Sequence, residues 1–181
     1  MRDNKFRSFK VAFGGIIAAL SIVFMFSTGI VPTLTYAIPA ICGALLMTVV
    51  IEISPVFAGA IYIAVSILSL LVVADKEAAV MYTAFFGYYP IIKSFIEKFT
   101  GKVLSWIIKY IIFNIAMVSS YFVSSKMFMV TFEDIEFLGK FALPALLFAG
   151  NIVFAIYDVA LTRLVTGYLI HWRKYVKRVF K

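Results

Sequence analysis

Asn151, Asp158 and Arg163 lie within an otherwise apolar stretch, GNIVFAIYDVALTRLV, which runs from Gly150 to Val165. Asp158 follows Asn151 by two helical turns, so a helix places both side chains on one face. Polar and charged groups are unfavourable in lipid, and they pair with one another or mark the path of an ion or substrate. We expect a structural ion pair here, with a proton-coupling site at Asp158 as the alternative. The candidate members of the pair are Asp158, Arg163, Lys93, Lys109 and Glu52.

Two asparagines and two tyrosines are predicted to lie near the middle of the membrane. At about 1.5 Å per residue, Asn114 and Asn151 each lie roughly 15 Å from the start of a long apolar stretch. Tyr88 and Tyr89 fall at a similar depth, beside Gly87 and Pro90, which predict a kink because proline interrupts the helical hydrogen bonds. These polar side chains either hold helices together or line a small-molecule pocket. The sequence leaves both interpretations open.

Small residues recur at helical spacing near the start of the chain. Gly14 and Ala18 are four residues apart, and so are Gly15 and Ala19. Side chains of this size leave a shallow groove in which a second helix can approach closely. The groove serves either packing within the same protein or docking of a partner membrane protein.

The residues that most often bind metals or act as nucleophiles are scarce. The single cysteine, Cys42, lies in an apolar run, and the single histidine, His171, lies in a basic tail. This excludes a His/Cys metal cluster and argues against thiol catalysis. The acidic group Glu133, Asp134 and Glu136 could bind a cation, but a solvated helix edge is the favoured interpretation. No Walker motif is present, and we expect no cofactor and no enzymatic activity.

The composition indicates that lipid surrounds these elements. Hydrophobic residues make up 64% of the 181 residues and charged residues 14%, with a mean hydropathy of +1.03. A soluble domain has roughly 45–50% apolar and about 25% charged residues, and one small core cannot bury the excess. The apolar stretches are too long for the strands of a membrane barrel. We therefore predict an all-α membrane protein.

The apolar stretches predict one domain, a bundle of six transmembrane helices. Their predicted bounds are 9–30, 36–53, 56–73, 78–95, 104–130 and 141–170. The net charge is +8, and the basic residues gather in both tails and in the segment 93–102. The positive-inside rule then places both termini in the cytoplasm of a multi-pass protein of the cell membrane. We expect the basic tails to contact anionic lipid rather than nucleic acid.

Two segments resemble a known transporter family. GGIIAALSIVF (Gly14–Phe24) is similar to the Ala-rich first helix of the substrate-binding (S) component of energy-coupling factor (ECF) transporters, and YAIPAICGALL (Tyr36–Leu46) also carries the resemblance. Where that family commonly has Ala-x-x-x-Ala, this chain has Gly14 and Ala18. The resemblance covers the whole chain in architecture but only these two segments in motif.

The resemblance implies partners and a binding site. A transmembrane coupling protein, driven by a pair of cytoplasmic ATPases, would dock at Gly14, Gly15, Ala18 and Ala19. A vitamin or other small micronutrient would bind from outside, beneath the first loop, in a pocket lined by some of Tyr36, Tyr82, Tyr88, Asn114, Ser120 and Asn151. The expected function is uptake of this small-molecule substrate. The alternatives are a structural scaffold of the cell-shape or envelope machinery, without a small-molecule ligand, and a proton-coupled carrier that uses Asp158.

Overall fold

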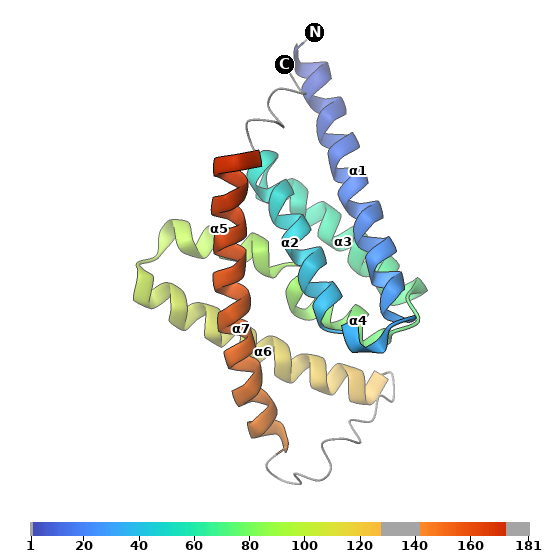
Figure 1. The fold of residues 1–181 in the computed structure, drawn as a ribbon, viewed down its shortest axis with the longest axis vertical. Helices are drawn as coiled ribbons and strands as arrows, with labels where there is room; N and C mark the ends of the chain where they lie inside the picture. Colours follow the sequence, from blue (N-terminus) through green and yellow to red (C-terminus); the bar gives the residue numbers. More distant parts are fainter. Residues whose placement is uncertain (1, 128–141, 173–181) are drawn as a thin grey trace.

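The computed structural model describes residues 2–127 and 142–172, and no strand occurs among them (Figure 1). The helices are α1 (Arg2–Thr28), α2 (Ala37–Glu52), α3 (Pro55–Val72), α4 (Lys76–Met81), α5 (Tyr89–Phe99), α6 (Lys102–Met127) and α7 (Ala142–Gly167). A 3₁₀ turn, η1 (Pro32–Leu34), and two π-helical turns, η2 (Tyr82–Phe86) and η4 (Tyr168–Trp172), join or extend them. The predicted all-α class is confirmed. The acidic group Glu133, Asp134 and Glu136 lies outside the described residues.

Four helical stretches are long and apolar enough to cross a membrane, as expected of a membrane protein. They are Arg7–Thr28, Pro55–Val72, Lys102–Val123 and Leu147–His171. Large apolar side chains such as Ile16, Phe148 and Ile156 are more than 60% exposed on these helices, and lipid is the solvent that suits such a surface. The other two predicted spans differ from these four in length or continuity.

Helix α2 has 16 residues and is roughly 24 Å long, shorter than the hydrocarbon core of about 30 Å. The fourth predicted span is divided into α4, η2 and α5. The predicted interruption at Gly87 and Pro90 is therefore present. It takes the form of a π-helical turn, in which the Gly87 amide donates to the Tyr82 carbonyl oxygen at 2.8 Å. Six spans with both termini in the cytoplasm remain a prediction.

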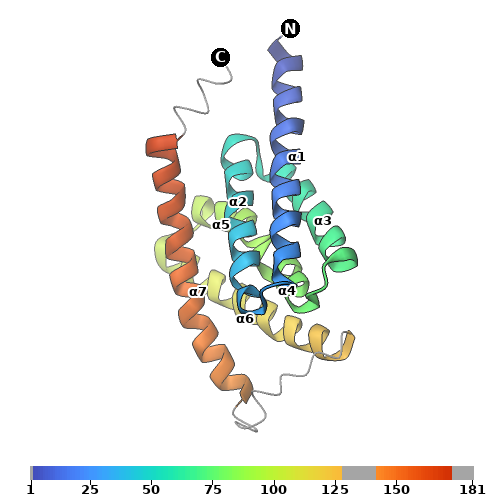
Figure 2. The same cartoon turned by 45° about the vertical axis from the view of Figure 1, so that its right-hand side comes forward.

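Helix α2 lies at the centre of the molecule. It packs against α1 and α3 on one side and against η2, α5 and α7 on the other, and in both views it lies between α1 and α7 (Figures 1 and 2). Helix α6 runs obliquely across α7 in the same views. One buried apolar cluster joins α1, α2 and α3, and a second, rich in aromatic rings, joins η2, α5, α6 and α7. This second cluster borders the charged groups described next.

Candidate functional site

Four charged side chains form a closed network of ion pairs among α5, α6 and α7. The ammonium of Lys93 lies 2.5 Å from Asp158 Oδ1 and 2.6 Å from Glu97 Oε1. The ammonium of Lys109 lies 3.0 Å from Asp158 Oδ2 and 2.6 Å from the same Glu97 oxygen. Each lysine therefore contacts both carboxylates, and the four charges sum to zero. We call Lys93, Glu97, Lys109 and Asp158 the charge network.

Helix geometry positions these groups. Tyr89, Lys93 and Glu97 recur every four residues along α5, which places them on one face of the helix. The Tyr89 hydroxyl donates to Asp158 Oδ1 at 2.5 Å, so this oxygen accepts from both Tyr89 and Lys93. Lys109 reaches the other oxygen from α6. Asp158 therefore has donors from two helices, and its charge is well compensated.

The members of the charge network differ in how far their side chains are exposed. The side chains of Lys93, Lys109 and Asp158 are 1%, 3% and 3% exposed, whereas that of Glu97 is 40% exposed. Glu97 thus connects three buried charged groups to the surface. In a low-dielectric interior such an arrangement is tolerated only when each charge has a close counter-charge and hydrogen bonds. The contacts of the three buried groups meet this condition.

The predicted ion pair forms with two of the candidate lysines, but Arg163 is not a member. Asp158 pairs with Lys93 and Lys109, whereas Arg163 makes no ion pair within residues 2–127 and 142–172. Arg163 is five residues beyond Asp158, which on a helix turns its side chain well away from the face that carries Asp158. Glu52 does not contribute to the charge network either; Glu97, which was not among the candidates, supplies the second carboxylate.

A cavity of about 480 Å³ opens beside the charge network, and we call it the polar cavity because most of its lining residues are polar or charged. Its lining includes side chains from the end of α5, the first turns of α6 and the second half of α7. The complete lining is Glu97, Thr100, Lys102, Ser105, Trp106, Lys109, Asp158, Val159, Thr162 and Arg163. This cavity combines cations, hydroxyls and one indole ring, and it is the candidate functional site of the described structure.

The two asparagines predicted near the membrane centre bind each other. Asn114 Nδ2 donates to Asn151 Oδ1, and Asn151 Nδ2 donates to Asn114 Oδ1, both at 3.0 Å. The amide of Asn114 also donates to the Tyr110 carbonyl oxygen at 2.8 Å, and that of Asn151 to the Leu147 carbonyl oxygen at 2.7 Å. The two side chains therefore link α6 to α7 by hydrogen bonds, and each side-chain amide already uses its two N–H donors.

The remaining predicted substrate residues have different surroundings in the described structure. Tyr82 is fully buried, and its hydroxyl has no hydrogen-bond partner in the described part of the chain. The ring of Tyr88 packs edge-on against Tyr62, with centroids 6.0 Å apart. The buried hydroxyl of Ser120 donates to the Ala116 carbonyl oxygen at 2.7 Å. These three residues line neither the polar cavity nor a smaller apolar one between α2 and α7, and the same holds for Tyr36, Asn114 and Asn151.

Tyr36 belongs to the first loop, which is fastened to the start of α4. The Tyr36 hydroxyl donates to Glu77, and the Thr35 hydroxyl donates to Asp75 Oδ2 at 2.8 Å. Asp75 also caps α4, because its side chain accepts the Ala78 amide at 3.0 Å. The uncharged loop is thus held against the bundle by two side-chain contacts to neighbouring acids.

The four small residues of α1 divide into two stripes with different surroundings. A methyl group on Gly14 would lie 2.6 Å from the Phe57 ring of α3, whereas one on Gly15 would meet nothing within 4 Å. Ala18 packs against the α1–α3 core, and Ala19 is exposed. Gly14 and Ala18 therefore serve internal packing, which is one of the two roles expected of the groove. Gly15 and Ala19 lie on an uncovered part of the α1 surface.

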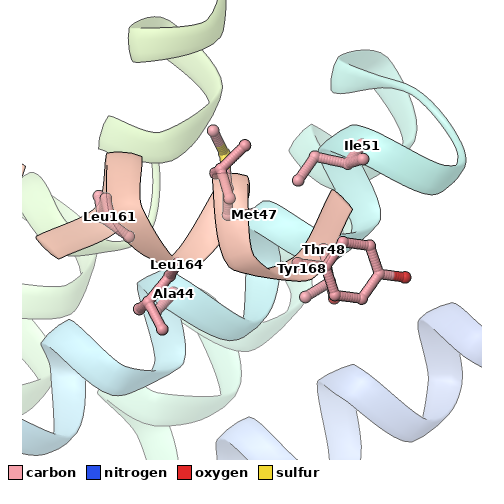
Figure 3. Close-up of a pocket in the computed structure, with 8 residues that line it drawn as sticks. Ala44, Met47, Thr48, Ile51, Leu161, Leu164 and Tyr168 are labelled. Atoms are coloured by element: carbon pink, nitrogen blue, oxygen red, sulfur yellow. The ribbon is translucent and has the colours of Figure 1, made fainter. Parts of the chain in front are cut away.

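The smaller cavity, of about 30 Å³, lies between α2 and the end of α7 (Figure 3). Apolar side chains such as Met47, Leu161 and Leu164 form most of its wall, with Tyr168 at one edge. The volume is close to that of a single water molecule. This cavity is a packing gap and offers no set of polar groups for a ligand.

Sequence reasoning missed Glu97 as a member of the charge network and Tyr89 as a donor to Asp158. It also missed most of the residues that line the cavity, namely Thr100, Lys102, Ser105, Trp106, Val159 and Thr162. The detectable signal for Glu97 and Tyr89 was the four-residue spacing of Tyr89, Lys93 and Glu97, which places them on one helix face. No protein-family model, curated protein or solved structure matches this chain.

Proposed function

We propose that this chain is the substrate-binding subunit of a membrane uptake system for a vitamin or other small micronutrient. In this proposal it works with a separate transmembrane coupling protein and cytoplasmic ATPases, as the resemblance to the S component of ECF transporters implies. The chain would cross the cell membrane six times and keep both termini in the cytoplasm.

The observation that carries the proposal is the open stripe of Gly15 and Ala19 on α1. Both residues are exposed, and no atom from outside this part of α1 lies within 4 Å of the position that a Gly15 side chain would take. Such a stripe allows a second helix to approach the α1 backbone closely. The neighbouring stripe, Gly14 and Ala18, already packs inside this chain's own bundle, so α1 can pack internally on one stripe and against a partner on the next.

The unpartnered Tyr82 hydroxyl supports a ligand site inside the bundle. A buried hydroxyl without a hydrogen bond is unfavourable by about 1–3 kcal/mol, and a polar substrate group would remove this penalty. Tyr82 lies five residues beyond Glu77, which holds Tyr36 of the first loop. In this proposal the substrate enters when the loop contacts at Asp75 and Glu77 open.

Co-purification of the full chain from its native membrane tests the proposal. The wild-type protein should bring a coupling protein and ATPases with it, and mass spectrometry should identify a retained small molecule. Gly15→Trp and Ala19→Trp should reduce this association at least about tenfold, because a bulky side chain closes the groove. The matched control is Ile67→Trp, at an exposed apolar position of α3, and it should leave association intact. Normal association of Gly15→Trp and Ala19→Trp would count against the proposal.

A structural membrane scaffold is the second candidate, and the reciprocal Asn114–Asn151 pair favours it. Both side chains are saturated by each other and by their own helices, as expected of groups that join α6 and α7. A scaffold would contain no ligand, and the Asn114→Leu/Asn151→Leu protein would keep its function. Loss of a retained small molecule in that double variant would instead favour the uptake subunit.

A further inference from the structure

The polar cavity beside the charge network contains two cations that have no acidic partner in the part of the chain that the structure describes. Lys102 and Arg163 line the cavity and belong to no ion pair among those residues. The carboxylates of Glu97 and Asp158 are already shared between Lys93 and Lys109. The cavity therefore carries positive charge that its own acids do not neutralise.

Hydrogen-bond donors accompany these cations. Ser105 is 6% exposed and lines the cavity, and its hydroxyl makes no hydrogen bond within the described ranges. Thr100 and Thr162 also line the cavity, but their hydroxyls donate to carbonyl oxygens of α5 and α7. Helix α6 begins at Lys102, which lines the cavity, so the positive end of the helix dipole lies near the cavity as well.

We propose that this cavity binds a net-anionic phosphate group. Arg163 and Lys102 would supply the charge, Ser105 would supply a hydroxyl donor, and Trp106 would form part of the wall. Arginine forms paired hydrogen bonds to phosphate oxygens, and helix N-termini favour such anions. A metal cation is disfavoured, because both acidic side chains in the cavity are held by lysines.

The phosphate group could come from an anionic phospholipid or from a soluble phosphate. Basic cavities between transmembrane helices accept lipid head groups, and the exposed Trp106 beside the cavity suits an interfacial position. This inference is independent of the proposed uptake function, because it concerns other residues and no coupling protein.

Fluorescence of Trp106 in the full chain tests the inference. The sequence has two tryptophans, Trp106 and Trp172, so Trp172→Phe leaves Trp106 as the single fluorophore. This protein is placed in nanodiscs of phosphatidylcholine, whose phosphate carries a choline cation. One series raises the fraction of phosphatidylglycerol, and a second adds inorganic phosphate. A saturable change in either series supports the inference, and the series that responds identifies the source.

Variants of the cavity complete the test. Arg163→Gln should raise the amount of phosphatidylglycerol or phosphate at half-maximal fluorescence change about tenfold, because it removes a charged hydrogen-bond donor. Ser105→Ala should raise this midpoint a few-fold. The matched control is Lys98→Gln, since Lys98 is exposed at the same end of α5, lies over the Phe99 ring and does not line the cavity. No response to either probe, or equal weakening by Lys98→Gln, would overturn the inference.

Discussion

Asp158 is the residue on which the charge network depends. It accepts hydrogen bonds from Tyr89, Lys93 and Lys109, and it is almost completely buried. A buried ion pair adds little stability by itself, because desolvation of the charges offsets their attraction. Removal of one partner is different, since it leaves the remaining charges buried without compensation. The network therefore fixes the register of α5, α6 and α7, and its loss is expected to be strongly destabilising.

We predict that Asp158→Asn lowers the free energy of unfolding by about 3 kcal/mol. The substitution keeps the shape of the side chain but leaves two lysines to share Glu97. Thermal unfolding of the purified protein in detergent measures the effect. Arg163→Gln, on the same helix but outside the network, should change stability by less than about 0.5 kcal/mol. Equal stability of Asp158→Asn and wild type would show that the network is not structural.

The Asn114–Asn151 pair gives a second prediction at this scale. Either single leucine substitution should destabilise the protein by about 1 kcal/mol, because it leaves a polar group of the other asparagine without its partner. The double variant should lose less than the sum of the two single losses. A double-mutant cycle on unfolding in detergent measures this difference, and strictly additive losses would contradict a coupled pair.

At the scale of the elements, helix α2 and the π-helical turn η2 approach each other closely at Gly43. The carbonyl oxygen of Phe86 lies against the position that a Gly43 side chain would take, and the Tyr157 hydroxyl lies 2.7 Å from it. The π-helical turn thus directs a backbone carbonyl towards α2. Gly43 is required by this close approach of η2 and α7 to α2.

We predict that Gly43→Ala destabilises the protein by about 2 kcal/mol, because the added methyl group forces α2 away from a backbone atom that cannot rotate aside. Gly59→Ala is the matched control, since nothing lies within 4 Å of its added methyl group. On helix α3 this control should be neutral or stabilising by up to about 1 kcal/mol, as alanine favours the helix. Thermal melts of the two variants provide the comparison, and equal destabilisation would disprove the contact.

At the scale of the whole molecule, the number of membrane crossings depends on the segment from α4 to α5. This segment is divided by η2, and it must cross the membrane if α2 crosses and both termini lie on one side. The start of α1 and the end of η4 both point towards the top of the molecule in Figures 1 and 2, as an even number of crossings requires.

We predict that Ala74→Cys and Gly101→Cys react with a membrane-impermeant thiol reagent from opposite sides of the membrane. Both positions are exposed, and the single native cysteine, Cys42, is fully buried and should contribute little background. Labelling of intact cells and of inverted vesicles distinguishes the two sides, with Ala74→Cys expected to react from outside. Reaction of both cysteines from the same side would mean that the segment between them does not cross.

The sequence by itself determined the environment and the class of this protein. Its apolar stretches and low charge require lipid as solvent and helices as the spanning elements, and Gly87 with Pro90 marked the interruption before α5. Asp158 and the two lysines could be proposed as ion-pair members, because charge within an apolar helix needs a partner. These inferences depend on local composition and spacing, which a single sequence contains.

Only the tertiary structure decided which of these groups meet. Helix rotation directs Gly14 into Phe57 but leaves Gly15 open, although both have the same spacing to an alanine. Likewise, the packing of α5 against α6 and α7 joins Asp158 to Glu97 through two lysines and excludes Arg163. The physical reason is that the azimuth of each helix is set by contacts between distant segments, and no local pattern specifies it.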